Sequence, residues 1–266
     1  MIVTTRLVLL TTFLILLTGC ERPEKAAREL RTLKIAAAAD LRFALPVVKE
    51  AFEKSHAGTT LELTFGASGT LLAQIENGAP FDIFLSADEK YAQKLTDAGK
   101  TLSDQPFPYA RGHLVIWVSN SSKLDLAGAG LKVLEDPSIQ HVSIANPQHA
   151  PYGRAAIAAL KYFQLEETLK DKLVFGENVA QAAQFAQSGT AQVGLIAKSL
   201  AMSEEMMKAG WFVDVPLEAY PPLIQAGVII KSKGDYETAG SFEAYLTSDQ
   251  ARAELAKYGF APPEEP

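Results

Sequence analysis

The sequence is poor in the residues that most often build metal sites, redox centres and nucleophilic active sites. Cys20 is the only cysteine among 266 residues, so no disulfide can form within the chain. The four histidines are scattered, and no pair of histidines or carboxylates has the spacing of metal ligands. Phosphate-binding and dinucleotide-binding glycine fingerprints are missing as well. These absences argue against a metal enzyme and against a nucleotide-dependent enzyme.

Clusters of basic residues are also missing. The chain has 25 Lys and Arg residues against 31 Asp and Glu residues, which gives a net charge of −6 and a pI near 5.3. Nucleic acids select basic surfaces, so they are excluded as partners. A small anion is not excluded, because salt screens surface charges beyond about 8 Å and local dipoles then outweigh the net charge.

The N-terminus has an apolar run that is too short to cross a bilayer. Leu7 to Leu17 provides about 11 apolar or hydroxylated residues after Arg6, whereas a membrane-spanning helix needs about 20. The run Leu17-Thr18-Gly19-Cys20 resembles a bacterial lipobox. We therefore expect a signal peptide over residues 1–19, a lipid on Cys20, a tether over residues 20–32 and a periplasmic or extracytoplasmic location. The alternative is a short signal anchor with a chance cysteine.

Beyond the tether, short apolar strands alternate with amphipathic helices, which predicts α/β units with mainly parallel sheets. The clearest strands are expected at residues 33–38, 60–65, 81–85, 113–118, 141–145, 173–175, 193–196 and 227–231. Proline-rich segments at 106–112 and 216–222 are interpreted as two crossovers between lobes. The predicted architecture is two mixed sheets joined by a hinge, with lobe I formed by 33–110 plus 226–262 and lobe II by 111–225.

Four strand-to-helix junctions share one property that bears on function. They are Ala39-Asp40, Ala67-Ser68-Gly69, Pro151-Tyr152-Gly153 and Asn178-Val179. A helix N-terminus presents unpaired backbone N–H groups and a positive partial charge, which together favour an anion. Such junctions gather at the carboxyl ends of parallel strands. The residues therefore predict an anion site between the lobes, with four ordinary helix starts as the alternative.

The chain resembles the periplasmic molybdate-binding proteins of ABC importers over nearly all of the region after the tether. The segments that carry this resemblance, in order, are AAAADLRFAL (36–45), FGASGTLLAQIENGAPFDIFLSADEKY (65–91), ANPQHAPYGRAAIAAL (145–160), GENVAQAAQFAQSGTAQVGLIAKSLA (176–201) and KYGF (257–260). The resemblance implies a type II periplasmic binding protein fold that holds molybdate or tungstate through neutral donors. It further implies a monomer that delivers this ligand to ABC permease subunits, with no cofactor and no catalysis.

Residue by residue, the resemblance assigns an oxyanion contact to three positions. Ser68 matches a serine that provides its hydroxyl and amide, and Tyr152 and Val179 match backbone amide donors, so no metal ion is bound directly. A serine expected in the first loop is missing, and either Ala39 or Asp40 stands in its place.

Two further expectations follow from these departures. The Asp40 carboxylate is expected to turn inward and cap the amide of residue 42 or 43, because it would repel a dianion. A tyrosine of a later strand is replaced by Ala197, and the hydroxyl of Tyr152 is expected to compensate.

Other interpretations stay open at this point. Sulfate, phosphate or an organic anion could be the ligand, and a two-lobed enzyme or sensor subunit could use the same fold. Gly66 to Thr70 misses a serine-hydrolase elbow by one residue. Asp82 and Asp88 are interpreted as capping or hinge residues rather than catalytic acids, and Arg111 and Arg154 as solvated or hinge-bridging residues rather than ligands of the anion.

Overall fold

The computed structural model describes residues 31–231 and 234–264. The predicted signal peptide, Cys20 and the tether up to residue 30 lie outside the described residues. The first strand begins at Arg31, two residues before the expected start, so residues 31 and 32 belong to the fold. Within the described ranges, no helix combines the length and the apolar character that a bilayer crossing requires.

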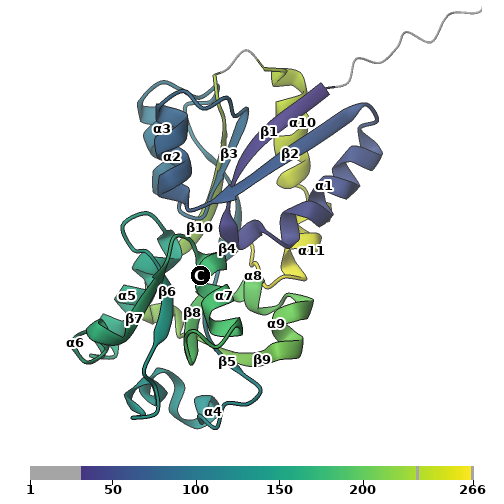
Figure 1. Cartoon of the computed structure of the whole chain (residues 1–266). Coiled ribbons are helices and arrows are strands. Elements are labelled where there is room, and N and C mark those ends of the chain that lie inside the picture. The colour runs from purple at the N-terminus through teal and green to yellow at the C-terminus, as the bar shows by residue number, and fades with distance from the viewer. Residues whose placement is uncertain (1–30, 232–233, 265–266) are drawn as a thin grey trace, which may run out of the picture.

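The strands form two sheets of five, one above the other in Figure 1. Lobe I contains β1 (Arg31–Ala38), β2 (Thr59–Gly66), β3 (Ile83–Ser86), β4 (Phe107–Gly112) and β10 (Leu223–Ile229). Lobe II contains β5 (Leu114–Ser119), β6 (Val142–Ala145), β7 (Leu173–Gly176), β8 (Val193–Ala197) and β9 (Gly210–Asp214). The chain passes between the sheets twice, from β4 to β5 and from β9 to β10.

Both sheets have the same plan. Their strand orders are β2-β1-β3-β10-β4 and β7-β6-β8-β5-β9, with three parallel strands followed by two that add antiparallel pairs. In each sheet the fourth strand is the one that arrives from the other lobe, which ties the lobes together at two crossings. The predicted α/β fold with two mixed sheets is confirmed, although each sheet has as many antiparallel as parallel pairings.

Helices cover both faces of the first sheet (Figure 1). The helical elements of lobe I are η1 (Ala39–Leu41), α1 (Ala44–Ser55), α2 (Ser68–Glu76), α3 (Glu89–Asp97), α10 (Tyr236–Leu246) and α11 (Asp249–Ala256). Along β1, Leu33, Ile35 and Ala37 pack with α1, α10 and α11, whereas Ala36 packs with α2 and α3. This alternation follows from side chains pointing to opposite faces of a strand.

The second sheet carries the larger apolar core. Its helical elements are α4 (Leu126–Ala129), η2 (Gly130–Glu135), α5 (Pro151–Tyr162), α6 (Glu166–Leu169), η3 (Lys170–Lys172), α7 (Val179–Gln187), α8 (Lys198–Ala201) and α9 (Glu204–Ala209), with η4 (Leu217–Ala219) in the second crossing. Residues Leu114 to Val118 of β5 are fully buried. The continuous apolar run of this strand is thus explained by burial on both faces.

Two strands were not expected from the sequence. The segment interpreted as the first crossover is β4, which lies at the edge of its sheet, where a proline such as Pro108 is tolerated. The register jumps between Gln225 and Ala226, so that Tyr109 is left without a partner in a bulge. The second unexpected strand, β9, forms the edge of the other sheet.

Candidate functional site

The four junctions singled out in the sequence lie at the carboxyl ends of parallel strands. β1 leads into η1 and β2 into α2 in lobe I, while β6 leads into α5 and β7 into α7 in lobe II. The two groups of strand ends face each other across the boundary between the lobes.

All four junctions border one small cavity. Its lining includes all five residues named as candidate ligand contacts, and comprises Ala38, Ala39, Asp40, Gly66, Ala67, Ser68, Ala87, Ala150, Pro151, Tyr152, Asn178 and Val179. Its volume is about 10 Å³, which is the space that one water molecule needs. Its walls come from both lobes, so its volume depends on how closely the lobes approach each other.

Three of the four helical elements begin there without a side-chain cap. The residues before η1, α2 and α5 are Ala38, Ala67 and Ala150, and none of them caps its helix. By contrast, Asp88 and Asp235 cap α3 and α10 with their carboxylates. A buried helix start without a cap leaves amide donors in need of a partner. Of the amides at these starts, those of Ala39, Ser68 and Tyr152 belong to residues that line the cavity, and α2 and α5 begin there with the positive ends of their dipoles.

The start of α7 differs, because the side chain of Asn178 is a genuine cap. Its Oδ1 atom accepts from the amides of Ala180 at 3.0 Å and Gln181 at 3.1 Å. The amide of Val179 is not engaged by this cap. Val179 is therefore left to face the cavity with its backbone donor.

Ser68 lines the cavity, and its hydroxyl accepts one hydrogen bond from the backbone. Ser68 is buried, and its Oγ atom accepts a hydrogen bond of 3.0 Å from the amide of Ala87. Because the oxygen is held as an acceptor on that side, its own proton is available on the other side.

Asp40 turns inward as predicted, since it is 1% exposed, but it does not make the predicted cap. Neither η1 nor α1 has a side-chain cap, so the carboxylate does not cap the amide of residue 42 or 43. Its Oδ2 atom instead accepts a hydrogen bond of 2.7 Å from Nε2 of Gln225, a residue 185 positions later in the chain. The expectation failed because tertiary structure offers Asp40 a partner from β10 that no local pattern indicates.

Burial decides the charge of Asp40. Removal from water raises its pKa from 3.8 to about 6, although hydrogen bonding with the side chains of Tyr152 and Gln225 and with the amides of Asp40 and Leu41 partly lowers it. Burial also raises the pKa of the Tyr152 hydroxyl well above its usual value. This hydroxyl faces Asp40, yet neither it nor Oδ1 of Asp40 has a hydrogen bond of regular geometry among the described residues.

A buried polar network behind the cavity was missed in the sequence. Gln225 is fully buried, and its Oε1 atom accepts a hydrogen bond of 3.2 Å from the hydroxyl of Tyr109. At Gly112, a Cβ atom would overlap the hydroxyl of Tyr152, so only glycine fits beside it. The available signal was the single polar residue in the apolar run LIQAGVII (223–230), because a buried polar residue needs a specific partner.

Several contacts join the two lobes around the cavity. Nη2 of Arg154 on α5 pairs with Oδ2 of Asp88 at 2.7 Å, and Nη1 donates to the hydroxyl of Tyr91 on α3 at 2.6 Å. The amide of Gly69 donates to the carbonyl of His149 at 2.9 Å. Arg154 is thus a bridge between lobes, and Asp88 serves as a cap and as its ion-pair partner.

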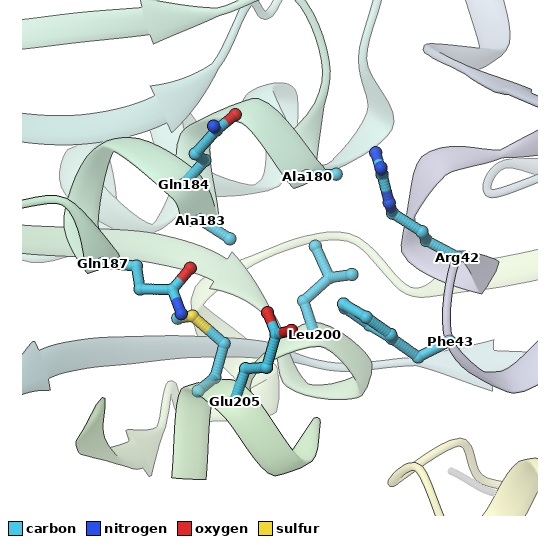
Figure 2. Close-up of a pocket in the computed structure, with 9 residues that line it drawn as sticks. Arg42, Phe43, Ala180, Ala183, Gln184, Gln187, Leu200 and Glu205 are labelled. Atoms are coloured by element: carbon cyan, nitrogen blue, oxygen red, sulfur yellow. The ribbon is translucent and has the colours of Figure 1, made fainter. Parts of the chain in front are cut away.

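Two neighbouring cavities do not share these amide donors. One of about 490 Å³ adjoins the small cavity through Gly66, Ala67 and Asn178, and its position indicates a mouth to the site. Another of about 210 Å³ lies on the flank of the boundary (Figure 2). There Arg42 extends from lobe I, and Glu205 lies among the residues of lobe II.

Comparison with known proteins places the chain in a family. A family model described as bacterial extracellular solute-binding protein matches residues 33–261. The chain belongs to this family. It is therefore an extracytoplasmic solute-binding protein and not an enzyme. Within the described residues, no group of three or more His, Cys, Asp or Glu side chains is placed to hold a metal ion.

Individual relatives agree with this assignment. The molybdate-binding protein ModA of Azotobacter vinelandii is 36% identical over 88% of this chain and 91% of its own length. ModA of Rhodobacter capsulatus is 37% identical over 76% of this chain and 78% of its own length. The solved structure of the Azotobacter vinelandii periplasmic molybdate-binding protein has a TM-score of 0.81, with 32% identity over 87% of this chain and 100% of that chain.

The raised pKa of Asp40 makes the stability of this solute-binding protein depend on pH. The Asp40 carboxyl group loses its proton less readily in the folded chain than in the unfolded chain. Its contribution to the free energy of unfolding is therefore most favourable below about pH 4 and falls as pH rises through about 6. Asp40→Asn should therefore increase the free energy of unfolding at pH 7 by about 2–3 kcal/mol and have little effect near pH 4.

Chemical denaturation across this pH range measures the effect. Asp104→Asn removes an exposed carboxylate and serves as the control. A difference between Asp40→Asn and the parent protein that does not change with pH would contradict this account of Asp40.

Proposed function

We propose that this protein captures molybdate outside the cytoplasm and delivers it to the permease of an ABC importer. The observation that carries the proposal is the convergence of four helical starts from two lobes on one buried cavity. Hydrogen bonds to a charged partner contribute about 1.5–3 kcal/mol each, so four to six of them reach micromolar affinity or better after the cost of closure. The names of the two ModA relatives support molybdate as the anion.

The proposed ligand contacts are Ala39, Asp40, Ser68, Tyr152 and Val179. Ala39, Tyr152 and Val179 contribute backbone amides at the starts of helical elements, and Ser68 adds its hydroxyl. All of these groups bind oxygen atoms of the anion, so no protein atom coordinates the metal. Tungstate has the same charge and shape and is included in the proposed ligand class.

The proposal extends to the anchor and to the moving parts. Residues 1–19 act as a signal peptide, a lipid on Cys20 holds the protein at the membrane, and the residues from 20 up to the start of β1 at Arg31 provide reach. The two lobes, which meet between β4 and β5 and between β9 and β10, close on the anion as a monomer by bending at these two crossings.

Thermal unfolding in a panel of oxyanions tests the ligand. Molybdate and tungstate should raise the melting temperature progressively with concentration, because ligands that bind only the folded state stabilise it. Phosphate should have little effect. Sulfate binding as tightly as molybdate would contradict the assignment of the ligand and leave an oxyanion site in place.

Ser68→Ala tests the location of the site. The variant keeps the amide of residue 68 and loses only the hydroxyl, so molybdate affinity should fall about tenfold to a hundredfold. Titration calorimetry gives the dissociation constant directly. An affinity equal to that of the parent protein would place the ligand elsewhere.

Gly69→Ala tests closure. A Cβ atom at this position would lie 2.8 Å from the carbonyl oxygen of His149 in the opposite lobe, so the lobes could not close fully. Molybdate affinity should fall at least about tenfold. The melting temperature without ligand should change little, because most of the clash is with the other lobe.

Gly240→Ala is the matched control for this variant. Gly240 lies within α10, and a Cβ atom there would meet nothing within 4 Å. This control should bind molybdate like the parent protein. Small-angle scattering supplies a second readout, since molybdate should reduce the radius of gyration of the parent and of Gly240→Ala but not of Gly69→Ala.

A further inference from the structure

The two oxygens of the Asp40 carboxyl group have different surroundings. Oδ2 accepts the 2.7 Å hydrogen bond from Gln225, whereas Oδ1 is buried, and the carboxyl group faces the hydroxyl of Tyr152 without a hydrogen bond of regular geometry at Oδ1 among the described residues. Asp40 is 1% exposed and lines the small cavity. A buried oxygen that makes no regular hydrogen bond at a proposed anion site needs an explanation, because buried polar atoms are normally hydrogen-bonded.

Gln225 fixes which oxygen can carry a proton. Its Oε1 atom is occupied by the hydroxyl of Tyr109, so its Nε2 atom is directed to Asp40 as a donor. Oδ2 of Asp40 must therefore remain an acceptor. A proton bound to this carboxyl group resides on Oδ1.

No cation from the elements packed against η1 compensates Asp40. The elements that pack most extensively against η1 are α7, α8 and β2, and Arg42, which directly follows η1, lines the cavity of about 210 Å³, whose lining does not include Asp40. α7 has no ionisable side chain, and Lys198 of α8 pairs with Asp214 at 2.9 Å. On β2 the ionisable residue is Glu62, which is exposed and in register with Lys34, away from the end that leads to the cavity.

The nearby side chains of β4 and α5 do not compensate the charge of Asp40 either. Burial raises the pKa of Tyr109 and Tyr152 well above the usual value, so both hydroxyls are neutral. Arg154 of α5 is paired with Asp88, and Arg111 of β4 is not among the groups that shift the pKa of Asp40. An ionised Asp40 would therefore face a dianion without a compensating positive side chain.

We infer that Asp40 is a specificity-determining residue that binds the oxyanion as a neutral carboxylic acid, with the proton on Oδ1 donated to an oxygen of a fully deprotonated tetrahedral dianion. This inference rests on the proposed oxyanion site. The one covalent change is an O–H bond formed at Oδ1 with a proton from solvent. An anion that carries a proton itself, such as hydrogen phosphate, is disfavoured. The neutral carboxylic acid of Asp40 is a donor at Oδ1, so it provides no acceptor there for the hydroxyl proton of the anion.

The binding of the anion is thereby linked to the uptake of one proton. The pKa of Asp40 is about 6 before the anion binds, so the carboxyl group is mostly ionised at neutral pH. The apparent dissociation constant should be level below about pH 6 and should rise about tenfold for each pH unit above it.

Titration calorimetry with molybdate from pH 5.5 to pH 8.5 tests the inference. Repeating each titration in two buffers with different ionisation enthalpies counts the protons taken up. The parent protein should take up close to one proton per molybdate at pH 8 and progressively less towards pH 5.5. Sulfate provides a second probe, because it stays fully deprotonated throughout this range.

Asp40→Asn is the decisive variant. Its side-chain carbonyl can accept from Gln225 while its amide donates to the anion, which reproduces the neutral acid without a titrating proton. Binding should become independent of pH, without proton uptake. At pH 8 the variant should bind about a hundredfold more tightly than the parent, and near pH 5.5 the two should agree within a few-fold.

Glu243→Gln is the matched control. Burial also raises the pKa of Glu243, but this residue lies on α10 and does not line the cavity. The control should keep the pH profile of the parent protein.

The negative results of these experiments distinguish the proposed function from the proposed role of Asp40. Absence of binding by any oxyanion, or a Ser68→Ala variant with full affinity, would count against the proposed function itself. Molybdate binding that is independent of pH in the parent protein would overturn only the role of Asp40. The same holds if Asp40→Asn binds weakly at every pH, or if phosphate binds best and more tightly as pH rises.

Discussion

The structure depends on one constraint, namely that the backbone amides at buried helix starts need a partner. At η1, α2 and α5 the chain provides alanine where a capping side chain would satisfy those amides. Elsewhere, as at α3 and α10, it caps helices with aspartate. In the proposed function, an anion held between the lobes would supply an acceptor to both sides at once. Closure and binding would then be the same event, because each lobe would contribute part of the donor set.

This arrangement separates local from global electrostatics. The net charge of −6 does not prevent the binding of an anionic ligand, because the amides and dipoles act within a few ångströms and surface charges are screened by salt. Asp40 is the exception, because it lies at the cavity itself. Two unit charges 4 Å apart repel by about 4 kcal/mol at an effective dielectric constant of about 20, and a dianion doubles this value. That exceeds the contribution of any single hydrogen bond, which is why the proposed role of Asp40 requires its carboxyl group to be protonated when the anion binds.

Much of the fold could be predicted because its signals are local. The short apolar run of β1 and the continuous apolar run of β5 indicated buried strands of an α/β protein, and the structure explains each by the faces it buries. β4 was not predicted, because Pro106 and Pro108 suggested a connection. A proline is harmless on an edge strand, but whether a strand lies at an edge is set by the order of strands in the sheet.

The candidate site shows the same division between local and tertiary information. Helix starts at Ser68, Tyr152 and Val179 were visible in the sequence, since a strand followed by a turn and a helix is a local pattern. The environment of Asp40 was decided by tertiary structure alone. Its partner Gln225 is 185 residues away, and the bulge at Tyr109 that orients this partner arises from strand pairing. The sequence by itself determined where the helices begin and therefore which amides lie at their starts, whereas only the packing of distant strands determined how the one acid among these residues is held and ionised.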